Sequence, residues 1–137
     1  MAYGIWRMAN GVWHIANGRE KMFRFEGLEI WRLAIEYADK IYDITMRFPK
    51  DELFGLTSQI RRASISISAN IAEGSLSDSN REFKSFLNYA IRSTGETVSE
   101  SVIAKKRGYL SKEEFQSIYE KAEILVKRTT VFKKGLK

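Results

Sequence analysis

The sequence contains no cysteine, one proline and one histidine among its 137 residues. Without cysteine there is no disulfide framework, no thiolate metal site and no cysteine nucleophile, so packing has to stabilise the fold. No apolar run approaches the roughly 18 to 20 residues that span a bilayer, and no segment resembles a secretory signal. We therefore expect a cytoplasmic protein that has no membrane partner.

The chain does contain enough apolar side chain for one domain with a real core, because 44% of its residues are hydrophobic and 12% are aromatic. Its formal net charge is +6. A positive surface favours RNA or DNA as a partner, since a protein that neutralises phosphates releases condensed counterions. Solubility alone also accounts for this charge, because small soluble domains commonly carry about 2 to 8 net charges.

Four long segments are separated by the only proline and by three glycines, namely Pro49, Gly74, Gly108 and Gly135. Within each segment the apolar residues recur at steps of three and four, the spacing of one face of an α-helix. The connections are short, about four or five residues, so sequential helices have to run antiparallel. We predict an all-α fold, an up-down-up-down antiparallel four-helix bundle with helices at approximately 28–47, 52–73, 79–107 and 112–134.

The segment SISISANIAEGS, residues 64–75, fits two periodicities. Its apolar residues alternate with polar ones as in a half-buried strand, but Ile60, Ile67 and Ile71 also keep the helical steps. Length decides between the two, because the helical pattern lasts about five turns whereas strands usually stop at about four to eight residues. We therefore expect a helix here, with Gly74 as a left-handed C-terminal stop.

Two serines are placed to begin helices. Ser79 is followed three residues later by Glu82, and Ser111 by Glu114. This is the spacing of a capping box, in which each side chain accepts a hydrogen bond from the other residue's backbone N–H. We therefore expect the third and fourth helices to begin directly after these serines.

The first 24 residues differ from the rest. WRMANGV at 6–12 is followed at once by WHIANGR at 13–19, a tandem repeat with Asn-Gly in each copy. Asn-Gly between short apolar runs is a strong hairpin signal, so a small β-meander across residues 3–25 is one interpretation. The other is a short duplication read through from an upstream start, with Met22 as the authentic initiator. We accordingly separate an N-terminal extension, 1–24, from a four-helix-bundle domain, 25–137.

Polar residues form a second row on the second predicted helix and a shorter row on the third. If both rows face inward they should satisfy each other, with Arg62 pairing with Glu96 or Glu100, because an unpaired buried polar group costs roughly 1 to 3 kcal/mol. We interpret them as a structural layer that fixes helix register, since the only histidine, His14, lies in the N-terminal repeat. The alternative is a small-ligand or metal site, or an enzyme active site. The layer comprises Gln59, Arg62, Ser66, Asn70, Glu73, Ser93, Glu96 and Glu100.

No charged residue occurs from Ala63 to Ala72. The outward face of a helix in an isolated bundle usually carries Lys, Glu or Arg, so something should cover this side of the second helix. We expect a second copy of the chain to do so. The alternative is a serine-rich face that is exposed and has no partner. The expected contact residues are Ile65, Ser68, Ala69 and Ala72.

Four stretches carry a family resemblance: FEGLEIW, RFPKDELFGLTSQIRRASISISANIAEGS, REFKSFLNYAIRSTGE and the Gly-Tyr-Leu of 108–110. They resemble the bacterial four-helix-bundle family named after proteins encoded in intervening sequences of large-subunit ribosomal RNA genes. The resemblance covers residues 25–132, and Asn-Ile-Ala-Glu-Gly at 70–74 is fairly specific in combination with LTSQIRRA. Gly95 departs from the family pattern, either to permit close packing or as a weak helical turn.

The resemblance implies an all-helical homo-oligomer, with a ring-like pentamer favoured. Relatives include the accessory protein of diversity-generating retroelements, which works with a reverse transcriptase and RNA. For most members no reaction is established, so the family supplies no catalytic residues and no cofactor. A start near the Phe-x-x-Leu-x-x-Trp element is usual in the family, which favours Met22 as the initiator.

The leading hypothesis is a non-catalytic oligomeric scaffold, without cofactors, that binds nucleic acid or a nucleoprotein partner. In an up-down bundle the start of the first helix, the start of the third and the end of the fourth share one pole. Repetition in a ring would multiply the positive field of the cations there. The alternative to a binding site at this pole is an ordinary charged end that is solvated. The competing function is a ligand site or an enzyme active site in the polar layer. The candidate nucleic-acid-binding residues are Arg24, Arg81, Lys84, Lys127, Arg128, Lys133, Lys134 and Lys137.

Overall fold

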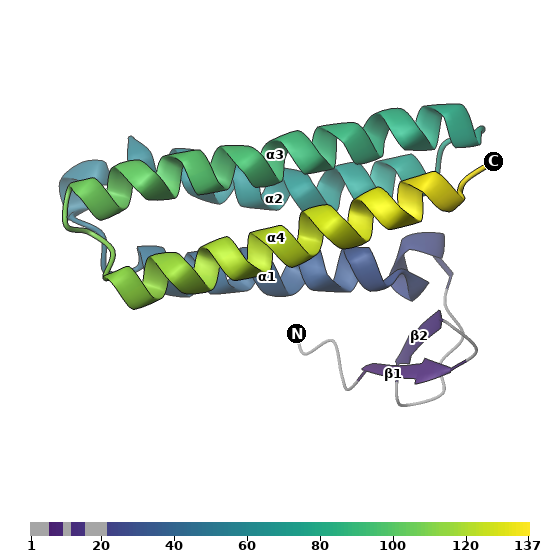
Figure 1. Cartoon of the computed structure of the whole chain (residues 1–137), viewed down its shortest axis with the longest axis horizontal. Helices are drawn as coiled ribbons and strands as arrows, with labels where there is room; N and C mark the ends of the chain where they lie inside the picture. Colours follow the sequence, from purple (N-terminus) through teal and green to yellow (C-terminus); the bar gives the residue numbers. More distant parts are fainter. Residues whose placement is uncertain (1–5, 10–11, 16–21) are drawn as a thin grey trace.

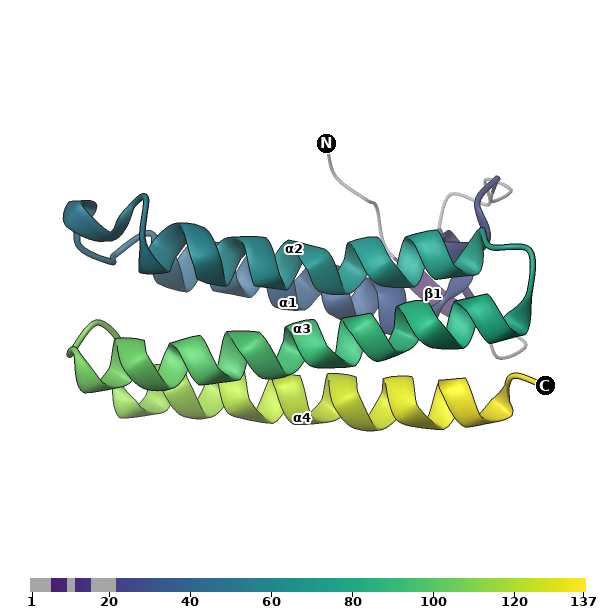
Figure 2. The same ribbon diagram turned by 90° about the horizontal axis from the view of Figure 1, so that it is seen from above.

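Four antiparallel helices make up the computed structural model, which describes residues 6–9, 12–15 and 22–137. Figure 1 shows them running up, down, up and down along one long axis, as the sequence predicts. The two views in Figures 1 and 2 place α1 diagonally opposite α3, and α2 opposite α4. The helices are α1 (Glu29–Thr45), α2 (Leu56–Ser75), α3 (Asn80–Lys106) and α4 (Lys112–Gly135).

The core is the column of apolar side chains where the four helices meet. Every helix contributes residues that are at most 2% exposed, including Ile41, Ile60, Ile71, Leu87 and Leu125. These residues stand at the helical steps that the sequence pattern identifies, so one stripe of each helix is buried. Burial of these stripes is the main stabilising contribution in a chain that has no cysteine.

Hydroxyl groups on α3 lie inside this core. The Tyr37 hydroxyl from α1 lies 2.6 Å from Thr97 Oγ1, and Thr97 in turn donates to the backbone carbonyl of Thr94 at 2.6 Å. Thr94 and Ser101 each donate to a carbonyl four residues earlier in their own helix. Burial raises the pKa of Tyr37 to about 12, so its hydroxyl stays protonated. These buried hydroxyls are therefore satisfied within the bundle.

The second helix begins later than expected, at Leu56 instead of residue 52. Pro49 ends the first helical segment, and Lys50–Glu52 forms a short 3₁₀ turn. The side chain of Glu52 then accepts a hydrogen bond from the backbone N–H of Leu56 at 3.3 Å, with Gly55 as the N-cap. Glu52 therefore caps α2 from outside the helix, because the first N–H groups of a helix need an acceptor. The first connection is longer than the other two.

The role expected for Gly74 is wrong. It lies within α2, which continues to Ser75, and the helix ends with Leu76 in the right-handed region. Gly74 is required for another reason. A Cβ built there would lie 2.7 Å from both Phe83 Cδ1 and Phe86 Cβ on α3. The glycine therefore permits a close approach of α2 and α3.

Both serines cap their helices as predicted. Ser111 forms a complete capping box with Glu114. Ser79 accepts a hydrogen bond from the backbone N–H of Glu82, but among the described residues the return bond to the Glu82 side chain is not found. Gly108, between α3 and α4, has a φ of 80°, the left-handed conformation that favours glycine. Gly95 is exposed in α3, with open space around the position of a Cβ, so it does not serve close packing.

Two short segments of the N-terminal repeat form paired strands. Strand β1 (Trp6–Ala9) pairs antiparallel with β2 (Val12–Ile15), from Trp6 opposite Ile15 to Ala9 opposite Val12. The Asn-Gly pairs at 10–11 and 17–18 lie outside the described residues. The third strand of the expected meander is not found in the described residues 22–25, because a 3₁₀ turn (Arg24–Gly27) forms there and leads into α1.

Candidate nucleic-acid interface

Three chain segments meet at one end of the bundle, as the sequence predicts. The start of α1, the start of α3 and the end of α4 lie together there (Figure 1). The Asn80 side-chain amide donates to the backbone carbonyl of Lys137 at 3.0 Å, and the rings of Phe83 and Phe132 lie 5.6 Å apart. The C-terminal residues are thus attached to the start of α3. We call the eight cations predicted for this end the basic pole: Arg24, Arg81, Lys84, Lys127, Arg128, Lys133, Lys134 and Lys137.

Some cations of the basic pole have intramolecular partners. Arg24 stacks over the ring of Phe83 at 5.1 Å, Arg128 pairs with Glu29 at 3.0 Å, and Lys133 donates to Asn88 at 2.8 Å. Lys127 lies about two turns before the end of α4 and reaches Glu123 only at 3.9 Å. Within the described part of the chain, the remaining four make no ion pair: Arg81, Lys84, Lys134 and Lys137.

Positive charge is not uniform over the pole. On the α3 side, Arg81 and Lys84 share the surface with Asp78 and Glu82, which favourably face the positive N-terminal end of the helix dipole. The last turns of α4 carry cations beyond Glu123 and no further acid. Cations are also favourable at the C-terminal end of a helix dipole. The field of the pole is therefore concentrated over the end of α4.

The predicted polar layer does not face inward. Gln59, Arg62, Glu73 and Glu96 are exposed, so the rows follow the outer edge of the contact between α2 and α3. At this edge each helix exposes the residues that flank its buried apolar stripe. Long polar side chains at these positions can therefore reach water.

The centre of this edge is nevertheless a connected set of polar groups. The hydroxyls of Ser66 and Ser93 lie 2.9 Å apart across the two helices. Asn70 donates to the backbone carbonyl of Ser66 at 2.8 Å and to its hydroxyl at 2.9 Å. The predicted contact between the two rows therefore exists at these residues, at the rim of the core.

The specific ion pair predicted for this layer is wrong. Among the described residues, Arg62 pairs with neither Glu96 nor Glu100, because its side chain is exposed. Glu100 Oε1 is buried with no hydrogen-bond partner in the described part of the chain. Burial, together with the charge of Glu96, raises the pKa of Glu100 from 4.5 to about 7.

The outer face of α2 is apolar over part of its length. Ile65 is 46% exposed, and Ala69 and Ala72 are half-buried, as expected for residues near a contact. Ser68 is the exception: it is buried in the monomer and donates to the carbonyl of Ile65 at 3.1 Å. The prediction that Ser68 belongs to the outer contact is therefore wrong, because its side chain is buried against its own bundle.

Sequence reasoning missed a group of exposed apolar residues beside this face. Phe54 is 94% exposed and Met46 is 74% exposed, and Leu53 and Tyr42 are also open. A shallow groove of about 460 Å³ runs between Tyr42, Phe54 and Ile65. The signal was present in the sequence, since Leu53 and Phe54 stand next to each other outside the helical period and directly before Gly55.

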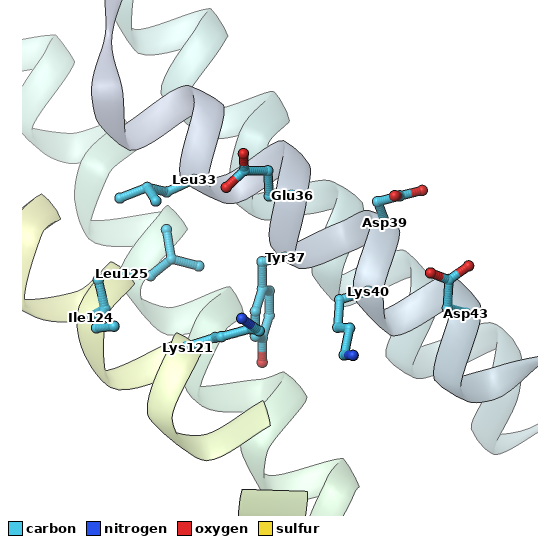
Figure 3. Close-up of a pocket in the computed structure, with 9 residues that line it drawn as sticks. All are labelled: Leu33, Glu36, Tyr37, Asp39, Lys40, Asp43, Lys121, Ile124 and Leu125. Atoms are coloured by element: carbon cyan, nitrogen blue, oxygen red, sulfur yellow. The ribbon is translucent and has the colours of Figure 1, made fainter. Parts of the chain in front are cut away.

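An acidic groove between α1 and α4 was also missed. Its volume is about 380 Å³, and Leu33, Ile124 and Leu125 form its apolar part. Figure 3 shows Glu36, Asp39 and Asp43 following one side of α1, with Lys40 and Lys121 nearer the groove. The three carboxylates are spaced three and four residues apart, which a helical projection reveals. This face carries negative charge, so phosphates are less favourable here than at the basic pole.

The described residues contain neither a membrane-spanning helix nor a cluster of metal ligands. None of their helices combines the length and the apolar character needed to cross a membrane. In the same part of the chain, no three histidine, aspartate or glutamate side chains are grouped where they could hold a metal ion. The acidic side chains are instead spread along the helix surfaces.

Comparison with known proteins gives the same fold. A crystal structure of a Bacteroides thetaiotaomicron protein of unknown function, from the S23 ribosomal protein family, superposes with a TM-score of 0.70. The two chains are 24% identical, and the match covers 77% of this chain and 95% of the other. None of the curated proteins matches significantly. The profile of one family matches residues 26–130. The chain therefore belongs to the family of 23S rRNA-intervening sequence proteins.

Proposed function

We propose that this protein is a non-catalytic homo-oligomer that binds RNA through its basic pole. The observation that carries the proposal is the convergence of cations from three chain segments at one end of the bundle, where Arg81, Lys84, Lys134 and Lys137 lack ion pairs with other described residues. Cations that are not neutralised internally are available to displace counterions from phosphates.

The outer face of α2 supports the oligomeric part of the proposal. Ile65 on this face lies in a groove with Tyr42 and Phe54, and Leu76 at the end of α2 is 57% exposed. Clusters of exposed apolar side chains, such as Tyr42, Phe54 and Ile65 in this groove, commonly mark a protein–protein contact. A second copy of the chain is the occupant that we propose, with Ile65, Ala69 and Ala72 near the contact. A closed ring would place several basic poles on one assembly and raise the apparent affinity for RNA.

RNA binding is tested with the full chain and a structured RNA over a range of salt concentrations. We expect the affinity to fall steeply with salt and to depend weakly on sequence. In the double variant Lys134→Glu/Lys137→Glu, the slope of log affinity against log salt should decrease by about one for each phosphate contact that is lost. Lys50→Glu, at the opposite end of the bundle, is the matched control and should leave the slope unchanged. Undetectable or salt-independent binding of the wild-type protein would contradict the proposal.

The oligomer is tested by light scattering of Ala69→Arg. A guanidinium at the centre of the apolar face should reduce the mass of the assembly, because an unpaired charge in a contact is strongly unfavourable. Gln116→Arg, on the exposed side of the diagonal helix α4, adds the same charge and should not change the mass. Equal masses for the wild type and both variants would exclude this face as the contact.

A further inference from the structure

A groove at the basic pole lies between the start of α1 and the end of α4. Its volume is about 910 Å³. Met22, Phe23 and Val131 expose apolar surface in it, at 86%, 44% and 69% respectively, and Arg24 and Arg128 line it as well. The groove therefore combines open apolar surface with cations, a combination typical of sites that bind single-stranded nucleic acid.

An aromatic stack ends in this groove. The ring of Phe23 is nearly parallel to that of Phe25, with 17° between the planes and 5.5 Å between the centroids. Phe25 in turn packs against Trp31 at 5.0 Å, and Trp31 is 7% exposed. The backbone carbonyl of Phe23 accepts a hydrogen bond from the N–H of Glu26 at 3.1 Å, which fixes the turn. The stack is thus anchored in the core while its last ring remains partly open to water.

Cations also lie beside this surface. Arg128 lines the groove, and Lys134 stands three residues after Val131 on the same helix face. Lys127 instead lines a groove on the α3 side of α4. The Arg128 side chain is 60% exposed and uses one terminal nitrogen on Glu29, which leaves further N–H donors for a phosphate. An apolar peptide would use the rings and leave these charges unpaired. A nucleotide uses both, since it joins a flat base to a phosphate.

We propose that this groove binds an unpaired RNA nucleotide, whose base stacks on the exposed part of Phe23 while Arg128 or Lys134 contacts the adjoining phosphate. This inference rests on the proposed RNA-binding function and adds the form of RNA that is recognised. Bases in a duplex are already stacked on both faces, so only loops, bulges and single strands offer a base to Phe23. The groove therefore selects unpaired RNA over duplex RNA.

The test uses a single-stranded oligoadenylate that carries one 2-aminopurine, whose fluorescence decreases on stacking. We expect the wild-type protein to quench the probe and to bind it more tightly than a duplex of the same length. Phe23→Ala should remove the quenching and weaken binding between about fivefold and a hundredfold, the usual range for the loss of one base–aromatic stack. Phe23→Trp should retain both. Tyr119→Ala is the matched control, because Tyr119 on α4 is exposed to nearly the same degree, 47%, and lies outside both the groove and the proposed contact between copies.

Three outcomes would overturn the inference. In the first, Phe23→Ala and Tyr119→Ala bind the probe equally well, with quenching intact. In the second, the wild-type protein binds duplex and single strand with the same affinity, which would leave RNA binding in place without a role for stacking. In the third, Phe23→Ala reduces the mass of the assembly, which would assign the groove to a contact between copies. If the wild-type protein binds no RNA at all, the proposed function itself fails.

Discussion

Replacing Gly74 with alanine adds one methyl group where α2 and α3 approach each other most closely. The new Cβ would lie 2.7 Å from Phe86 Cβ and 2.7 Å from Phe83 Cδ1, well inside van der Waals contact. Phe86 Cβ is fixed to its own backbone, and the Phe83 ring is 1% exposed and has no room to turn. The two helices would therefore have to separate at this point.

The expected magnitude follows from two opposing effects. Overpacking of a filled core typically destabilises by about 1 to 3 kcal/mol. Alanine is a better helix former than glycine by at most about 1 kcal/mol, and the gain is smaller here because Gly74 lies in the last turn of α2. We therefore expect Gly74→Ala to lower the free energy of unfolding by about 1 to 2 kcal/mol. Urea denaturation monitored by circular dichroism measures this change.

Gly95→Ala is the matched control, because it makes the same chemical change in α3 at a position where the added Cβ would meet no side chain of the described residues within 4 Å. Here only the helix propensity acts, so the variant should be more stable than the wild type by about 0.5 to 1 kcal/mol. The two substitutions should thus have opposite signs in one assay. If Gly74→Ala stabilised the protein as Gly95→Ala does, the close approach of α2 and α3 would be refuted.

Three further predictions concern hydrogen bonds and charge. The folded-state pKa of Glu100 is raised from 4.5 to about 7, so its carboxyl destabilises the fold progressively as pH rises through this range. Over the same pH interval the melting temperature of Glu100→Gln should therefore decrease less than that of the wild type. Identical pH profiles for the two proteins would contradict the raised pKa. Tyr37→Phe removes the buried hydrogen bond to Thr97 and should cost about 0.5 to 1.5 kcal/mol in urea denaturation, whereas an unchanged midpoint would argue that the bond is not formed. Ser111→Ala removes the N-cap of α4 and should cost about 1 kcal/mol, with Ser111→Asp restoring most of it; a silent Ser111→Ala would disprove the cap.

Features that depend on local sequence were predictable. Ser79, Ser111 and Gly108 act at helix ends through bonds and dihedral angles within a few residues, so their patterns identify them directly. The buried stripes follow from the helical period, and the short connections after α2 and α3 dictate antiparallel neighbours. The shared pole of the predicted cations follows from the same topology.

Apart from the start of α2 and the third strand of the meander, the errors concern the surroundings of a residue in space. Gly74 resembles a helix stop in sequence, but its role depends on Phe83 and Phe86 in the next helix. Arg62 and Glu100 stand on rows that could have faced each other. In the structure Arg62 is exposed and Glu100 is partly buried, because the two helices turn these rows toward the outer edge of their contact. Such rotations are decided by how side chains of two helices interlock, which no single periodic pattern contains.

The sequence by itself determined four helices, their order and direction, and the positive charge that gathers at one end, because each of these depends on short-range spacing and chain connectivity. Only the tertiary structure decided that the end of α4 lies against the turn carrying Phe23, that an aromatic stack opens into this groove, and that α2 and α3 approach closely at Gly74. The physical reason is that packing joins residues distant in the chain, and its outcome depends on the shapes of all the side chains at once.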